Sequence, residues 1–302
     1  MSYRNNRLYL SLLTLLLSCL LLSCEKEVKI SLAGTPPSVV VQGAIETNLP
    51  PYVVLTSTIS FFEKVDLKTL ENSFLHNATI TVADGSKTVP LKEYSFDTGS
   101  SSKFYVYSVD TANLANLMFG QVGRSYTLTI THGGATYTSV TTIPPVKGPD
   151  SVWFASPLFV RATTPANARQ LFANYTDPDT MGNYVRYFTQ RNGDRFFPSG
   201  LFSDEVVNGK VVNNIALYGG YDNTGEDINR DSLIYFFPGD SVTLKWAEID
   251  KGVYKFWNTM QFAQNAVGNP FASPINVQSN ISNGAVGVWA GYSSLLITRI
   301  AP

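Results

Sequence analysis

Acidic side chains are the first candidates for chemistry, because a pair of carboxylates is enough to hydrolyse a glycosidic bond. An Asp-Pro-Asp tripeptide occupies residues 177–179, and Asp204 and Glu205 are adjacent further along the chain. Asp-Pro-Asp is also typical of a turn, because Asp caps turns and Pro fixes φ. The second pair precedes an Asn-Gly dipeptide, which is typical of a hairpin tip. We therefore interpret both pairs as turn residues, with glycan hydrolysis by Asp177, Asp179 or Glu205 as an alternative.

The densest acidic stretch, residues 222–231, could supply the oxygen ligands that Ca²⁺ prefers. Asp227, Asn229 and Asp231 alternate as they would at the start of an EF-hand loop. Ser232, however, occupies the position of the turn glycine, and the closing glutamate is missing. We expect a solvated loop here, with these three side chains as calcium candidates, and we predict no cofactor.

Aromatic residues form 13% of the chain. Exposed aromatic rings stack on sugars or fill pockets in a partner protein. Phe196, Phe197 and Tyr221 lie in an aromatic-rich part of the second half, and we predict them as ligand or partner contacts. Most other aromatic side chains of this half are expected in the core, since half-buried strands favour them.

Several classes of chemistry lack the residues they require. The only two histidines, His76 and His132, lie in the first half, and no Gly-x-Ser-x-Gly elbow occurs. Neither a phosphate-binding glycine-rich loop nor a dinucleotide fingerprint is present. With 22 basic and 23 acidic residues, the chain also lacks the positive charge that nucleic-acid binding requires. We therefore predict a protein that is not an enzyme and does not bind nucleic acid.

Residues 1–23 have the pattern of a secretory signal, with two arginines before an apolar run. The sequence of residues 21–24, Leu-Leu-Ser-Cys, resembles the lipobox of bacterial lipoproteins. That resemblance implies cleavage before Cys24, a diacylglyceryl thioether on its sulfur and acylation of its new amine. Several acyl chains give stable anchoring. Two alternatives remain: lipidation at Cys19, or a membrane-spanning anchor formed by residues 8–23, which is short for a span.

Glu25-Lys26-Glu27 follows the lipidation residue directly and resembles the acidic export signals of Bacteroidota lipoproteins. The resemblance implies an outer-membrane protein that faces the cell exterior, and an ordinary polar tether is the alternative. Asp-Ser/Thr-apolar tripeptides also resemble the O-glycosylation sequon of exported proteins in this phylum, although Asp-Ser is common at turns as well. The candidate acceptors are Thr111, Ser151, Thr180, Ser232 and Ser241.

The elements that must position these residues are mainly β-strands. A chain of 302 residues suggests two domains after the signal and a tether at 24–37. About seven short alternating segments with frequent turns predict an immunoglobulin-like β-sandwich over residues 38–143. Three prolines mark a stiff linker at 144–150.

The remaining residues, 151–302, predict a second β-sandwich or open barrel with one packed helix. Apolar residues recur at the helical period over about 249–266, and Asp250 could cap this helix. The segments 284–291 and 295–297 are typical of a closing hairpin.

Several stretches together resemble a known family. They are Cys24-Glu25, Val39–Gly43, Asn77–Gly85, Gly123–Ile130, Thr142–Pro145, Gly268–Pro274 and Ser279–Trp289. Their order and spacing resemble the Bacteroidota lipoprotein family called domain of unknown function 4249, over nearly all of residues 24–302. That family has no established catalytic residues. Its members are often encoded beside TonB-dependent outer-membrane transporters, which implies a surface accessory subunit.

Taken together, these patterns predict a lipid-anchored outer-membrane protein that captures a ligand for a TonB-dependent transporter without catalysing a reaction. The sequence does not identify the ligand. A structural or assembly subunit of an outer-membrane complex is the alternative. The glycine-rich stretch 279–289 is interpreted as architecture, with a ligand site as its alternative.

Overall fold

Strands dominate the computed structural model, which describes residues 38–59, 65–97, 99, 102–220, 234–266 and 275–302. The described strands of the first half agree with the prediction of about seven short segments. They are β1 (Val39–Glu46), β2 (Tyr52–Ser57), β3 (Thr79–Ala83), β4 (Thr88–Asp97), β5 (Lys103–Val109), β6 (Ser125–His132) and β7 (Ala135–Thr142). Two short helical turns separate some of them, α2 (Leu67–Ser73) and η1 (Leu114–Asn116).

The second half is also mainly β, as predicted. Its described elements are β8 (Ser151–Ala155), β9 (Gln170–Thr176), β10 (Tyr184–Arg191), β11 (Phe197–Ser203), β12 (Val211–Leu217), β13 (Ser241–Ile249), α4 (Lys251–Ala266) and β14 (Val286–Ile300). Strand β11 was not predicted. A proline and a glycine in β11 explain why its sequence did not indicate a strand.

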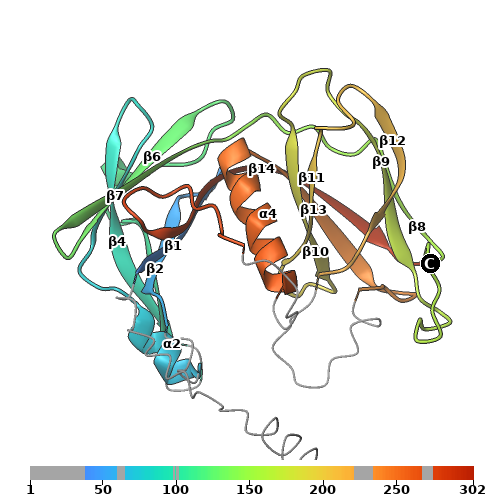
Figure 1. The fold of residues 1–302 in the computed structure, drawn as a ribbon, viewed down its shortest axis with the longest axis horizontal. Coiled ribbons are helices and arrows are strands. Elements are labelled where there is room, and N and C mark those ends of the chain that lie inside the picture. The colour runs from blue at the N-terminus through green and yellow to red at the C-terminus, as the bar shows by residue number, and fades with distance from the viewer. Residues whose placement is uncertain (1–37, 60–64, 98, 100–101, 221–233, 267–274) are drawn as a thin grey trace, which may run out of the picture. The chain divides into compact units, whose positions relative to one another are not determined.

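Strand β14 connects the two halves (Figure 1). It pairs in parallel with β1 and antiparallel with β13, within a sheet of order β11-β10-β13-β14-β1-β2-β5-β4-β3-β6-β7. A smaller sheet has the order β12-β9-β8. Residues 37–302 form one compact unit. The domain boundary at 144–150 stays a prediction, and the structure adds that the last strand pairs with strands from both sides of it.

The predicted hairpin of 284–291 and 295–297 is wrong, because these residues form one continuous strand. Gly291, the last residue of the first segment, allows close packing and does not form a turn. A Cβ on Gly291 would lie 2.8 Å from the carbonyl oxygen of Thr142 on β7. The chain turns earlier, at Asn283-Gly284, where both φ angles are positive, at 56° and 75°.

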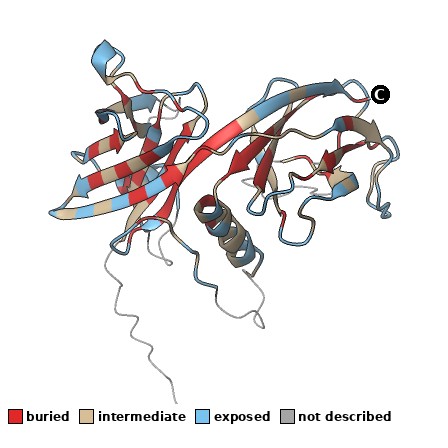
Figure 2. Cartoon of the chain, turned by 90° about the horizontal axis from the view of Figure 1, so that it is seen from above, coloured by how far each residue is buried: buried red, intermediate tan, exposed pale blue. Residues whose placement is uncertain are grey.

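Apolar side chains collect in three clusters, and alternation along β14 assigns its residues to different ones. Trp289 packs into the first cluster, among residues of β1 to β7. Val288, Ala290 and Tyr292 point to the other face and pack with α4. Another cluster, around Trp246, lies between the small sheet and the large one. In Figure 2 the first part of β14 is buried and its C-terminal part is exposed.

The predicted helix is present as α4 and begins at Lys251, because Ile249 still pairs with Tyr184 in the sheet. Asp250 caps it as expected: one carboxylate oxygen accepts the backbone N–H of Val253 at 2.9 Å. The other oxygen accepts the N–H of Thr142 at 3.1 Å, which ties the helix to β7. Within the described part of the chain, no helix is both long enough and apolar enough to cross a bilayer.

Candidate functional site

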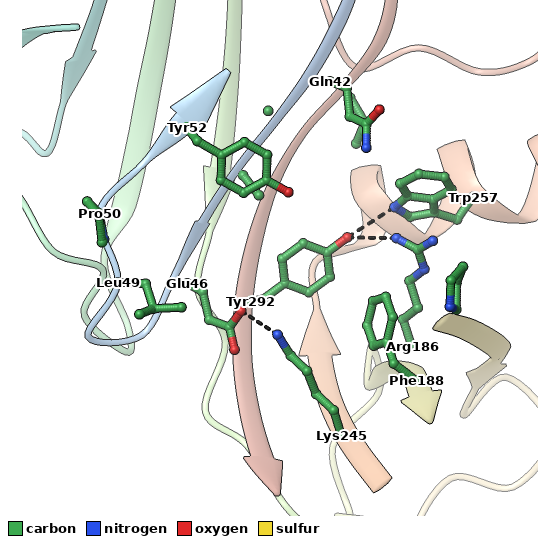
Figure 3. A pocket seen from close by; sticks show the side chains of 14 residues that line it. Gln42, Glu46, Leu49, Pro50, Tyr52, Arg186, Phe188, Lys245, Trp257 and Tyr292 are labelled. Atoms are coloured by element: carbon green, nitrogen blue, oxygen red, sulfur yellow. Dashed lines mark hydrogen bonds and ion pairs between the residues drawn. The ribbon is translucent and has the colours of Figure 1, made fainter. Parts of the chain in front are cut away.

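A cavity of about 350 Å³ opens where β1, β10, β13, β14 and α4 meet (Figure 3). Most of its wall is apolar or aromatic, and its charged side chains are few. We call it the Arg186 cavity after one of the charged side chains that line it. The aromatic and charged residues that line it are Tyr52, Phe188, Trp257, Tyr292, Glu46, Arg186 and Lys245.

Arg186 is charged but only 9% exposed. Its neighbours on β10, Tyr184, Val185 and Tyr187, are buried core residues. Its Nη1 donates to the Tyr292 hydroxyl at 3.0 Å, and the Trp257 indole N–H donates to the same oxygen at 3.2 Å. The guanidinium carbon lies 3.5 Å from the centre of the Trp257 ring. No carboxylate of the described residues pairs with Arg186. The side chain is therefore held by aromatic groups and not by an acid.

The other charges of the cavity are already paired. Lys245 Nζ lies 2.5 Å from Glu46 Oε2, and the Ser294 hydroxyl donates to the second oxygen of Glu46. The charges of Lys245 and Glu46 cancel. The charged side chains that line the cavity therefore sum to one positive charge, which is that of Arg186. Ion pairing with Lys245 also keeps the Glu46 carboxylate occupied.

Tyr52 faces Tyr292 across the cavity (Figure 3). Although the residue is 42% exposed, partial desolvation raises the pKa of its phenol, Tyr292 and Glu46 raise it further, and the charge of Arg186 opposes them. Its hydroxyl has no hydrogen-bond partner within the described ranges. The cavity thus presents a cation, a free phenol and flat aromatic walls, which are the features of a small-molecule binding site.

A smaller cavity of about 170 Å³ contains two of the predicted carboxylates, and we call it the acid cavity. Asp204 accepts the backbone N–H groups of Gly182 and Asn183 at 2.6 and 2.8 Å, and Asp177 accepts that of Gly209 at 3.1 Å. Each carboxylate therefore binds the backbone of the other acid's loop, and together they link the loop after β9 to the turn after β11. Asp179 and Glu205, the other members of the two pairs, are exposed and do not line this cavity.

Glu248 on β13 lies near these acids and was not predicted. It is 3% exposed, and the Tyr175 hydroxyl donates to it at 3.4 Å. Burial is the main reason that the pKa of Glu248 is raised to about 8, with Asp177 and Asp204 adding to the shift. Burial also raises the pKa of Asp177, against the opposing effect of the Gly209 N–H.

These shifts predict that the protein loses stability as pH rises. The folded state keeps a proton on Glu248 from the ordinary pKa of 4.5 up to about 8, whereas the unfolded state releases it. The stabilising contribution is therefore complete below pH 4.5 and disappears as pH increases through 8. Glu248→Gln keeps an oxygen for Tyr175 without an ionisable group.

Urea unfolding at about pH 5.5 and about pH 8.5 measures this effect. The wild-type free energy of unfolding should fall between the two conditions by clearly more than that of the Glu248→Gln variant. An equal fall in both proteins would mean that Glu248 ionises normally in the fold.

The family assignment follows from comparison with known proteins. A sequence model described as domain of unknown function (DUF4249) matches residues 25–295. The chain belongs to the DUF4249 family. Both cavities lie inside the matched region, which extends from before β1 into β14. No curated protein matches the chain at a significant level.

Two of the three predicted contact aromatics of this DUF4249 chain can be placed. Phe196 is half-buried, and its ring centre lies 5.9 Å from Lys245 Nζ, close to the Arg186 cavity. The guanidinium carbon of Arg195 instead lies 4.8 Å from the centre of the Phe197 ring, and Phe197 packs against Gly220. Tyr221 lies outside the described residues.

Some of the remaining predicted sites lie outside the described residues, and the others lie within them. The described ranges do not include Cys24, the calcium candidates Asp227, Asn229 and Asp231, or Ser232. Within those ranges no group of three or more His, Cys, Asp or Glu side chains is arranged to hold a metal. The other candidate glycosylation sites all lie on the surface, at Thr111, Ser151, Thr180 and Ser241.

Sequence reasoning missed the residues that form the Arg186 cavity. A signal was present: Arg186 interrupts the otherwise apolar and aromatic run Tyr184-Val185-Arg186-Tyr187-Phe188. A charged residue within a core strand requires a specific environment. The sequence did not indicate which distant segments supply that environment.

Proposed function

We propose that this protein is a lipid-anchored accessory subunit that captures a small ligand at the outer membrane for a TonB-dependent transporter, without catalysing a reaction. The Arg186 cavity is the observation that carries ligand capture. Its volume of about 350 Å³ suits a small organic molecule, since ligand sites commonly begin at about 300 Å³. The lipobox at residues 21–24 supports the anchor, and the family resemblance supports the transporter and a Bacteroidota origin.

The acid cavity gives less support to hydrolysis. Asp204 accepts backbone N–H groups from the loop that follows Asp177, and Asp177 accepts one from the turn that follows Asp204, so each has a structural role in the fold. A structural or assembly subunit would share the anchor and the partner. Such a subunit would not need a cavity that contains an arginine without a carboxylate partner.

Replacing Cys24 by alanine tests the anchor. We expect the Cys24→Ala precursor to keep its signal and to lack any acyl mass, because the thioether cannot form without the sulfur. Outer membranes from the native strain should yield a TonB-dependent transporter with the wild-type protein and none with the variant. Mass spectrometry of the native pull-down measures both results.

Cys19→Ala is the matched control, since it removes the rival thiol and leaves the lipobox at Cys24 intact. It should be cleaved and acylated as the wild type is. Acyl mass on Cys19, or wild-type pull-downs that never contain a transporter, would contradict the proposal. Stable recovery of a partner without binding of any small molecule would favour the structural subunit.

A further inference from the structure

We infer that the Arg186 cavity binds its ligand through one oxyanion, a carboxylate or a phosphate monoester, carried on a flat apolar body. This inference rests on the proposed function and specifies the chemical class of the captured molecule. It combines the unpaired charge of Arg186 with the position of its free donors and the shape of the cavity wall.

The charge argument starts from the cost of burial. A buried ion is expensive unless it is paired, and an apolar residue of similar volume would fill the site with less desolvation. Arg186 is 9% exposed, and within the described residues its one hydrogen bond goes to the neutral Tyr292 hydroxyl. The one acid among the residues that line the cavity, Glu46, is bound by Lys245 and Ser294. An incoming anion would therefore supply the charge that the protein itself does not supply.

The geometry of the guanidinium keeps donors available for that anion. Arginine has five N–H donors that lie in its plane. The contact with Trp257, at 3.5 Å from the ring centre, covers the flat face of the group. Tyr292 accepts from Nη1 only, so most of the donor edge remains free. That edge matches the spacing of carboxylate and phosphate oxygens.

The wall of the cavity determines the body of the ligand. Tyr52, Tyr292 and Phe188 present aromatic surface, and Leu49 and Val288 add aliphatic surface. The volume of about 350 Å³ corresponds to about twelve water volumes, which accommodates a molecule of two fused rings. An adjoining cavity of about 200 Å³ shares Arg186 and Trp257 and gives room for a longer substituent.

Selection against amines follows from the same charges. The net charge of the charged side chains in the wall is positive, and the one carboxylate is occupied by Lys245. A cationic group would therefore meet repulsion from Arg186 without a free acid to compensate. The free Tyr52 hydroxyl can add a hydrogen bond to either kind of oxyanion.

Isothermal titration calorimetry on the full-length protein in detergent tests the inference with four probes of one shape. They are 2-naphthoate, 2-naphthyl phosphate, 2-naphthol and 2-naphthylmethylamine. At least one anion should bind saturably and at least about tenfold more tightly than the alcohol and the amine. The tighter of the two anions identifies the carboxylate or the phosphate as the natural group.

Variants locate the binding. Arg186→Gln should weaken the favoured anion by at least about tenfold and leave the alcohol unchanged. Arg186→Lys, which keeps the charge, should weaken it less. Arg124→Gln is the matched control, because Arg124 is an exposed arginine paired with Asp84 outside the cavity. Circular dichroism checks that each variant is folded.

Three results would overturn the inference. They are no saturable binding of either anion up to about 10 mM, equal affinity for all four probes, and unchanged affinity in a folded Arg186→Gln variant. These results are separable from the proposed function, because the transporter pull-down depends on Cys24 and not on Arg186. Anion binding without a transporter would contradict only the partner, and a transporter without anion binding would contradict only the ligand class.

Discussion

Replacing Gly287 by alanine is expected to destabilise the protein by about 3 kcal/mol or more, as the sum of overpacking and backbone strain. A Cβ at this position would lie 1.9 Å from the carbonyl oxygen of Val41 on β1, where no real contact can exist. The φ angle of 138° is a further cost for any residue other than glycine. Because β1 and β14 pair here, relieving the clash would separate the two strands.

Urea unfolding and thermal melting measure this effect. For a chain of this size we expect the melting temperature to fall by at least about 6 °C. Gly284→Ala is the matched control. It also has a positive φ, of 75°, but an added Cβ would meet nothing within 4 Å. It should cost only about 1 kcal/mol. Equal losses in the two variants would show that backbone conformation, and not the approach of β1, makes glycine necessary at 287.

Trp289→Ala is expected to cost about 3 to 5 kcal/mol, the usual loss when a buried tryptophan is truncated. Trp289 is fully buried, and its indole N–H donates to the Tyr126 carbonyl on β6 at 2.9 Å. Gly43 on β1 makes room for the ring, since a Cβ there would lie 2.8 Å from Trp289 Cε3. The substitution would therefore leave a large void in the first cluster.

Trp289→Phe separates the two contributions in the same unfolding experiment. Phenylalanine keeps much of the apolar volume but leaves the Tyr126 carbonyl without its donor. We expect it to lose clearly less than the alanine variant, with about 1 to 3 kcal/mol attributable to the unpaired carbonyl. A Trp289→Ala protein with wild-type stability would mean that this side chain is not part of the core.

These two positions explain most of the stretch at 279–289 as architecture, in line with our interpretation. The Asn280 side chain accepts the Trp289 N–H at 2.9 Å and donates to its carbonyl at 2.8 Å, and so fixes the backbone of β14. The alternation of β14 also brings the same stretch to the Arg186 cavity, through Val288. The stretch therefore holds the core with one face and supports the candidate site with the other.

Local patterns in the sequence were sufficient to predict most strands and the helix. Alternation marked β6 and β7, and the two glycines between them, with φ of 58° and 79°, form a hairpin turn. The parallel pairing of β1 with β14 was not predictable, because it joins segments almost a whole chain apart and leaves no local pattern. Because this pairing was not predictable, Gly291, which permits close packing, was interpreted as part of a hairpin.

Of the two cavities, only the acids of the smaller one were indicated by the sequence. The residues next to Asp177 and Asp204 indicated two turns, but they did not indicate that each carboxylate would bind the backbone of the other acid's loop. Arg186 depends on Trp257 from α4 and Tyr292 from β14, and neither position is implied by the sequence around Arg186. Only the long-range pairing that sequence patterns do not encode brings them together.

A crystal structure of the protein grown with 6-bromo-2-naphthoate tests the central claim most directly, because anomalous scattering locates the bromine without reference to the fold. We predict the naphthyl ring in the Arg186 cavity, with its carboxylate within hydrogen-bond distance of Arg186 and the bromine pointing away from it. A ring that binds elsewhere, or that lies in the cavity with its carboxylate turned to solvent, would contradict the account.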